Sequence, residues 1–455
     1  MEKTKRKLNM VTDPPGRTMF FFALPMIMGN LFQQFYNIMD SVVVGKFVGE
    51  NALAAVGASY SITNVFIAIA IGGGIGSSVI VSQFFGARQI GNMKTAVSTT
   101  LINFLAVGIL LGAVGLWRNE WILGWMNTPK EVFADASAYL GIYFIGLPFL
   151  FMYNVQASVF NSLGDSKTPL GLLIFSSLLN IVLDLVFVIS FEWGVVGVAV
   201  ATLIAQGVSA VISFVILLRK IRGYEGPGEF RFYDPGMVFN MVKVALPSTL
   251  QQSIVHIGML LVQSVVNGFG AAVMAGYAAA TRIESISIVP MLAIGNAMST
   301  FSAQNMGAGR PDRVRHGYKV GCGMVGISAV ILCLASLLGG KYFLMAFLDP
   351  ESGREAFQTG VSYVTFICFF YVFIGLKTTT DGLLRGAGDV LVFTFANLVN
   401  LSIRVFVAFH FAPVWGVQAV WFAVPMGWAA NFIISFLRYL TGKWSEVKLI
   451  GEKYS

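Results

Sequence analysis

Twelve apolar stretches, each long enough to cross the hydrocarbon core of a membrane as a helix, dominate this sequence. A core about 30 Å thick takes about 20 helical residues to cross. Hydrophobic residues make up 56% of the 455 residues and charged residues only 11%, which leaves too little polar surface for a soluble globule. The chain is therefore predicted to be a polytopic membrane protein.

The predicted spans lack the period-two alternation of barrel strands. Since lipid cannot satisfy unpaired backbone groups, we expect every span to be a helix and the fold class to be an all-α membrane protein with twelve transmembrane helices. The predicted spans are residues 18–45, 53–85, 95–117, 133–161, 168–191, 194–219, 237–268, 271–305, 317–348, 356–385, 390–411 and 415–440.

The distribution of charge predicts the orientation of these helices. The basic opening MEKTKRKLNM precedes an apolar run with no small-residue cleavage site, which indicates a retained first helix and a cytoplasmic N-terminus. Alternation through twelve helices then places most Lys and Arg residues, and both termini, on the cytoplasmic side. The net charge of +8 therefore reflects orientation in the membrane and gives no support to nucleic-acid binding.

Four short motifs recur in the same order along the chain, 222, 221, 224 and 222 residues later. They are Ala23-Leu24-Pro25 with Ala245-Leu246-Pro247, Gln83 and Gly86-Ala87 with Gln304 and Gly307-Ala308, Gly164-Asp165 with Gly388-Asp389, and Trp193-Gly194 with Trp415-Gly416. This spacing predicts an internal duplication into two parallel six-helix repeats around a central cleft. The expected domains are a bundle of residues 1–222, a cytoplasmic linker of residues 223–236 and a bundle of residues 237–455.

Several kinds of site are not indicated. The chain has no G-x-x-x-x-G-K-[ST] phosphate loop, and the glycine run from Gly72 to Gly76 lies inside a predicted helix, where close helix packing or a hinge explains it better than a nucleotide site. The three cysteines, Cys322, Cys333 and Cys368, show no C-x-x-C spacing or nearby histidine pair and are expected to be plain thiols. We expect no cofactor.

Two carboxylates in the predicted helices of the first half, Asp40 and Asp184, have no basic partner in those helices. Counting from the helix ends places Asp40, Asp184 and Thr202 at one depth, with Asn180 one turn further in. Two buried carboxylates close together favour a bound proton or a shared cation such as Na⁺. The sequence predicts a cation-coupling site here; the alternative is that these groups only hydrogen-bond between helices.

The predicted helices of the second half carry more charge, with bases outnumbering acids. Lys377, Asp381 and Arg385 follow one another at helical spacing, so ion pairs are expected to neutralise much of this charge. A structural role competes with coupling or substrate contact, and His256 is either a structural histidine or a proton carrier. The residues of this possible polar network are His256, Arg282, Glu284, Lys377, Asp381 and Arg404.

Over nearly its whole length, the sequence resembles the multidrug and toxic compound extrusion (MATE) transporters. The similar features are ALPMIMGNLFQQFYNIMDSVVVG, SQFFGAR, NSLGDSKTP with N-x-x-x-D behind it, TRIES and QNMGAGR. The resemblance implies two six-helix bundles enclosing a V-shaped cleft, and efflux of organic compounds against entering H⁺ or Na⁺.

The sequence looks most like the DinF-like prokaryotic branch of that family. The resemblance implies coupling at Asp40, Asn180, Asp184 and Thr202, and a first helix able to bend at Pro25. The positions that match cleft-facing polar residues of the branch are Gln33, Tyr36, Asn37 and Asn154. Gln252 and His256 stand where other branches have a glutamate, and Arg404 occupies the repeat position of Asn180, which argues against a second cation site.

The function that we expect is a secondary active antiporter, which extrudes amphipathic, often cationic small molecules in exchange for H⁺ or Na⁺ by alternating access. It would act as a monomer in the prokaryotic inner membrane. The alternatives are a flippase for lipid-linked saccharides and an exporter of a specific metabolite with the same duplicated plan. An enzyme is disfavoured because His256, His316 and His410 lie on separate segments, and a passive channel is disfavoured by the twofold repeat.

Overall fold

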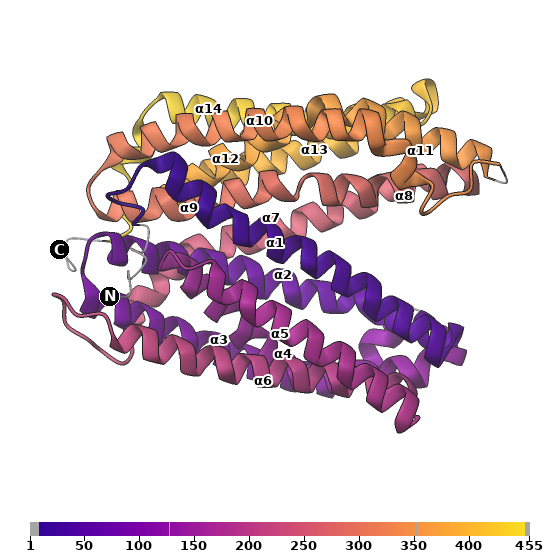
Figure 1. Ribbon diagram of the computed structural model, residues 1–455, viewed down its shortest axis with the longest axis horizontal. Helices are drawn as coiled ribbons and strands as arrows, with labels where there is room; N and C mark the ends of the chain where they lie inside the picture. The colour runs from indigo at the N-terminus through magenta and orange to yellow at the C-terminus, as the bar shows by residue number, and fades with distance from the viewer. Residues whose placement is uncertain (1–8, 127, 352, 451–455) are drawn as a thin grey trace, which may run out of the picture. The chain divides into compact units, whose positions relative to one another are not determined.

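The computed structural model describes residues 9–126, 128–351 and 353–450; the side chains of Ile38, Asp40, Ser41, Val42, Glu50, Asn51, Leu53 and His256 lie outside this description. The described residues form helices joined by short connections, with no β-strand among them, which confirms the all-α fold class. The α-helices in Figure 1 are α1 (Pro15–Val43), α2 (Glu50–Gly86), α3 (Ile90–Trp125), α4 (Lys130–Ser162), α5 (Lys167–Leu185), α6 (Gly194–Arg222), α7 (Pro235–Asn267), α8 (Ala271–Ser287), α9 (Val289–Gly307), α10 (Pro311–Leu344), α11 (Arg354–Ile367), α12 (Tyr371–Ala387), α13 (Val390–Trp415) and α14 (Gln418–Leu440). Shorter helical segments are η1 (Val44–Val48), η2 (Val186–Ser190), η3 (Cys368–Phe370) and η4 (Lys443–Glu446).

Eleven helical segments among the described residues are long and apolar enough to cross a membrane, and α1 adds a twelfth helix of 29 residues. Two spans that the sequence predicted as continuous helices are interrupted. α8 ends at Ser287 and α9 begins at Val289, directly before Pro290, which cannot continue the hydrogen-bond ladder of the helix before it. The other interruption is η3, a 3₁₀ turn between α11 and α12.

The described chain divides into two compact units by its internal contacts. One unit contains residues 28–249, and the other contains residues 9–27 and 250–450. α1 and α7 therefore each contribute to both units, and in each helix the division falls two residues after a proline, Pro25 or Pro247. Because proline removes a backbone hydrogen bond from a helix, these are the positions where each helix bends most easily.

The internal duplication is visible in the backbone as well as in the sequence. Eight of the eleven described residues with positive φ form four pairs that are 221 to 224 residues apart. The pairs are Gly49 with Gly270, Arg88 with Gly309, Gly164 with Gly388, and Gly194 with Gly416. Corresponding connections of the two repeats therefore turn with the same backbone handedness, which confirms the predicted duplication.

In the unit of residues 28–249, α4 lies against α2, α3 and α6 (Figure 1). The approach of α3 to α4 depends on glycines: a Cβ on Gly112 would lie 2.6 Å from the Phe144 carbonyl oxygen, and one on Gly115 would lie 2.3 Å from the Phe144 ring. Phe144, Leu147 and Phe151 of α4 are fully buried at the centre of this packing. Small residues of this kind let helix backbones meet closely in membranes.

In the other unit, α12 lies against α9, α10 and α14. A Cβ on Gly382 would lie 2.2 Å from the Gly295 carbonyl oxygen, and one on Gly386 would lie 2.2 Å from the Ser299 carbonyl oxygen. α9 and α12 therefore pack backbone against backbone. The charged residues of α12 are consequently held in a rigid position.

The glycine run of α2 packs against the first part of α7. A Cβ on Gly72 would lie 2.5 Å from the Thr249 Cα atom, and one on Gly76 would lie 2.2 Å from the Ala245 Cα atom. Both neighbours are backbone atoms, so they cannot move aside as a side chain could. The interpretation of these glycines as helix-packing positions is confirmed.

We predict that Gly76→Ala destabilises the protein by about 1–3 kcal/mol, because the added methyl group overpacks the α2–α7 contact. Gly57→Ala, in the same helix, is the matched control, since nothing lies within 4 Å of its Cβ position. Alanine has the higher helix propensity, so the control is expected to be neutral or slightly more stable. Thermal unfolding of both variants in detergent tests this, and equal melting temperatures would contradict the packing account.

The repeated Gly-Asp motif forms an ion pair in each half. Asp165 pairs with Lys220 near the end of α6, and Asp389 pairs with Arg438 near the end of α14, with 2.5 Å between Oδ2 and Nε. Asp165 also accepts a hydrogen bond of 2.7 Å from the Thr168 hydroxyl. Burial alone would raise the pKa of Asp165, but the hydrogen bonds from Lys220 and Thr168 and the charge of Lys220 together lower it.

Because the folded-state pKa of Asp165 is lowered, its contribution to stability is present above the ordinary pKa of 3.8 and is lost as the pH falls through the lower folded value. We predict that Asp165→Asn lowers the free energy of unfolding by roughly 1 kcal/mol at neutral pH. The difference from the wild type should shrink in strong acid. Melting temperatures across a pH series measure it; a difference that grows as the pH falls would contradict this prediction.

Candidate functional site

Most of α5 is apolar, but one of its faces is directed toward the interior of its own bundle. Asp184 lies on that face. Asn180 and Asp184 lie one turn apart and are 2% and 0% exposed, whereas Leu178 and Val182 are 54% and 57% exposed. Residues four apart share a helix face, so α5 presents one polar stripe inward and an apolar surface outward. The predicted inward placement of Asn180 and Asp184 agrees with these exposures.

Side chains from three helices meet at Asn180. Tyr36 of α1 hydrogen-bonds to the Asn180 side chain, and Nδ2 of Asn180 lies 3.4 Å from the hydroxyl oxygen of Thr202 on α6. The sequence had placed Asn180, Asp184 and Thr202 near one depth, and the fold brings Asn180 and Thr202 into contact. Tyr36, which was predicted to face a substrate cleft, contacts this cluster.

The surroundings of the Asn180 amide favour the second of its two possible orientations, because the first turns Oδ1 toward acceptors and Nδ2 toward donors. In one, Oδ1 accepts from the Tyr36 hydroxyl and Nδ2 donates to the Thr202 hydroxyl. In the other, Nδ2 donates to Asp184 Oδ2 over 3.3 Å and to the Tyr36 hydroxyl, while Oδ1 accepts from the Thr202 backbone N–H over 3.1 Å. A carboxylate only accepts hydrogen bonds, so the second orientation suits ionised Asp184, whereas the first suits a protonated Asp184 that can donate.

The described side chains of this cluster offer only oxygen ligands to a cation: the Asp184 carboxylate, the Asn180 amide oxygen and the Thr202 hydroxyl. Hard cations favour such oxygens. Among the residues described, no group of three or more His, Cys, Asp or Glu side chains is arranged to hold a metal ion. Asp40 follows Tyr36 by one turn of α1, but its side chain lies outside the described residues.

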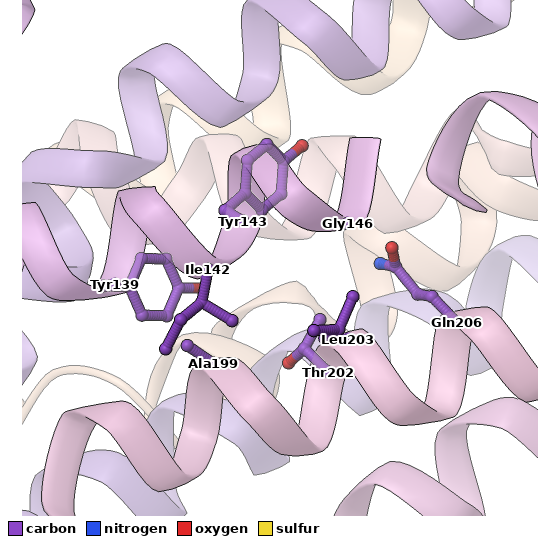
Figure 2. Close-up of a pocket in the computed structure, with 8 residues that line it drawn as sticks. All are labelled: Tyr139, Ile142, Tyr143, Gly146, Ala199, Thr202, Leu203 and Gln206. Atoms are coloured by element: carbon purple, nitrogen blue, oxygen red, sulfur yellow. The ribbon is translucent and has the colours of Figure 1, made fainter. Parts of the chain in front are cut away.

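A small pocket lies beside the cluster, between α4 and α6, with room for roughly one water molecule. Figure 2 shows its lining: Tyr139, Ile142, Tyr143 and Gly146 from α4, and Ala199, Thr202, Leu203 and Gln206 from α6. The Tyr143 hydroxyl donates to the Thr63 carbonyl oxygen over 3.3 Å. Tyr139, Tyr143 and Gln206 were not among the residues predicted from the sequence, although the two tyrosines lie one helical turn apart in an apolar span, which was a usable signal.

The other residues predicted to line a cleft make local hydrogen bonds. Gln33 donates to Asn37 on the next turn of α1 over 3.2 Å, and Asn154 donates to the Leu150 carbonyl oxygen over 2.8 Å. Their contact with substrate stays a prediction. Pro25 is buried inside α1, which is helical on both sides of it.

The charged residues of the second half form two separate groups. In the first, Lys377 and Asp381 make a buried ion pair with 3.1 Å between Nζ and Oδ2, as predicted. Asp381 also accepts from the Ser435 hydroxyl over 2.9 Å. Arg385, the third member of the predicted series, instead donates to the Ser299 hydroxyl and to the Asn296 amide oxygen.

In the second group, Glu284 accepts a hydrogen bond of 2.7 Å from the Tyr363 hydroxyl, and Arg404 lies within electrostatic range of Glu284. Arg282 is exposed and faces the Phe347 ring at 6.0 Å, because residues two apart on a helix point in different directions. No hydrogen bond or ion pair between described residues links Glu284 to Lys377 or Asp381. The side chain of His256, the remaining member of the predicted network, lies outside the described residues.

We predict that Asp381→Asn destabilises the protein by about 3–5 kcal/mol, because Lys377 would be left as an uncompensated buried charge. Lys377→Met combined with Asp381→Asn should recover most of this loss, since both charges of the pair are then removed together. Thermal unfolding in detergent provides the measurement. A double variant no more stable than Asp381→Asn alone would contradict a purely pairwise role for the two charges.

Comparison with known proteins identifies the family. The MatE family model matches residues 25–186 and again residues 247–410, one match in each repeat. The chain is 30% identical over 439 residues to the "Probable multidrug resistance protein YpnP" of Bacillus subtilis (strain 168), covering 96% of this chain and 97% of the relative. It is 25% identical over 321 residues to the "FAD transporter" of Shewanella oneidensis, covering 68% of this chain and 70% of the relative.

The fold agrees with solved structures of the same kind. A MOP superfamily transporter from Pyrococcus furiosus matches with a TM-score of 0.89 and 23% identity, over 98% of this chain and 100% of that chain. A multidrug resistance MATE family transporter of the MOP superfamily matches with a TM-score of 0.88 and 23% identity, over 99% of this chain and 100% of that chain. With two matches to the family model, a duplicated helical fold and eleven described spans besides α1, the chain belongs to the MATE family of multi-pass membrane transporters.

Proposed function

We propose that this protein is a secondary active multidrug exporter, which moves amphipathic, often cationic small molecules outward in exchange for entering H⁺ or Na⁺. The observation that carries the proposal is the fully buried Asp184 carboxylate beside Asn180, where α1, α5 and α6 meet. A carboxylate in the apolar part of a membrane protein is costly, and a coupling function explains why it is kept there. The family membership and the name of the Bacillus relative support the export activity.

Protonation of Asp184 would change which hydrogen bonds the Asn180 amide makes. Because Asn180 lies on α5 and Thr202 on α6, this would change the contact between the two helices. With Asp184 ionised, the amide nitrogen turns toward the carboxylate and Oδ1 accepts from the Thr202 backbone, which ties α5 to α6. When Asp184 takes up a proton, the amide oxygen can face the acid, and the contact with Thr202 moves to its hydroxyl. Na⁺ would act instead as a bound charge among the same oxygens, with Asp40 as the second carboxylate.

Movement would pass through α1, which carries Tyr36 to this cluster. The segment directly before α1 is held in the other unit, where the Met10 carbonyl oxygen accepts hydrogen bonds from Asn305 and Arg313. Pro25 lies between these two attachments, and Pro247 has the corresponding place in α7. Binding that differs in affinity between two bends of α1 would shift their populations, which is what alternating access requires.

The protein would lie in the prokaryotic inner membrane with both termini cytoplasmic, act as a single chain without a cofactor, and take its substrates as amphipathic small molecules. Gln33, Asn37 and Asn154 would contact the substrate. Export of a specific metabolite is the second candidate, because the Shewanella relative is named a FAD transporter.

The proposal is tested by efflux from proteoliposomes under an imposed pH gradient, and separately under an imposed Na⁺ gradient at constant pH. A cationic dye serves as the substrate and FAD as the second arm. We predict that Asp184→Asn lowers gradient-driven dye efflux by about 5- to 150-fold, the range of a coupling energy of about 1–3 kcal/mol. Asp135→Asn, which removes an exposed carboxylate from α4, is the matched control and should transport like the wild type.

The outcomes separate the parts of the proposal. Undiminished gradient-driven efflux by Asp184→Asn would remove the coupling role from this site. Transport of FAD without transport of any dye would replace multidrug export with export of a specific metabolite. The gradient that drives wild-type efflux identifies the coupling ion.

A further inference from the structure

Two cysteines that are 35 residues apart in sequence meet inside the unit of residues 9–27 and 250–450. The Cys333 thiol of α10 donates to the Cys368 sulfur of η3, with 3.6 Å between the two Sγ atoms. Cys368 is 1% exposed and also donates to the Thr365 carbonyl oxygen over 3.2 Å, whereas Cys333 is half-buried. Both cysteines are reduced, and the expectation of plain thiols had given no reason to place them together.

The two cysteines lie where a bond between them would restrain a break in a helical span. η3 interrupts the span Arg354–Ala387 between α11 and α12, and a 3₁₀ stretch within a helical span often marks a hinge. α10 lies against α11, η3 and α12. A covalent bond between Cys333 and Cys368 would therefore fasten this interruption to a continuous neighbouring helix.

We propose that Cys333 and Cys368 form an oxidation-sensitive modification site, in which a disulfide ties α10 to the helix interruption at η3. The sulfur atoms must approach from 3.6 Å to the disulfide length of about 2.05 Å. The oxidant would be a small, membrane-permeant two-electron oxidant such as hydrogen peroxide. This site is separate from the coupling residues, and the proposal does not depend on the transported substrate.

The reaction balances in two steps. The half-buried Cys333 thiol attacks the peroxide, whose O–O bond breaks; one oxygen forms a sulfenic acid on Cys333 and the other leaves as water. The Cys368 sulfur then displaces the sulfenic oxygen, which leaves as a second water with the thiol proton, and the S–S bond forms. Two thiols are thus oxidised, and one peroxide is reduced to two water molecules.

The experiment uses the full-length protein in native membranes, treated with hydrogen peroxide and, in parallel, with the permeant oxidant diamide. Free thiols are then alkylated, and digested peptides are analysed by mass spectrometry without reduction. We expect a peptide pair that joins Cys333 to Cys368 with the loss of two hydrogens, and its disappearance after reduction with dithiothreitol. Cys322, on α10 beside Tyr318, is the matched thiol: Cys322→Ser should leave the crosslink intact, and Cys333→Ser should abolish it.

A second measurement compares the melting temperatures of the oxidised and reduced proteins. Oxidised wild type and oxidised Cys322→Ser should melt roughly a few °C above their reduced forms, because the bond restricts the unfolded chain, whereas Cys368→Ser should show no such shift. Alkylation of both cysteines after oxidation, or a crosslink through Cys322 or between two molecules, would overturn the proposed pair. A crosslink without a rise in melting temperature would mean that the bond strains the packing of α10 against η3, and would overturn a disulfide that suits this fold.

Discussion

The absence of hydrogen-bonding partners in lipid is the constraint on which the rest of this structure depends. It requires the backbone of every span to satisfy itself, so each described span is helical. It also requires polar side chains to find partners inside the bundle. The Lys377–Asp381 pair meets that requirement within α12, and the Asn180 cluster meets it across α1, α5 and α6.

The two repeats share a backbone plan but carry different chemistry. Positive-φ residues recur at matching positions, and the Gly-Asp motif makes an ion pair in both halves. At the repeat position of Asn180, however, stands Arg404, and the position 224 residues after Asp184 holds Ala408. The first half therefore brings a carboxylate, an amide and a hydroxyl together, while the second half holds an ion pair on α12 and a hydrogen-bonded carboxylate on α8. The two halves thus share a backbone architecture and differ in the residues at these matching positions.

Contacts between residues close in sequence could be predicted, whereas contacts between residues far apart in sequence could not. Lys377 and Asp381 pair within one helix, so their spacing alone predicted the bond. The inward face of Asn180 and Asp184 also followed from helical spacing. Arg385 was placed correctly on its helix, but its partners Ser299 and Asn296 come from α9, which spacing within α12 could not reveal. The pocket between α4 and α6 and the meeting of Cys333 with Cys368 required the same kind of information, namely how separate helices are rotated against each other.

Composition and helical spacing were enough to predict the class of the protein, the approximate spans, the duplication and the helix faces on which the polar residues lie. These properties follow from composition and from the fixed geometry of the helix, which act along the chain. Which faces meet became visible only in the folded chain: Tyr36 and Thr202 reach Asn180, Arg282 points away from Glu284, and two distant thiols touch. Helix rotation and register are set by side-chain packing over many residues at once, and no local spacing encodes that sum.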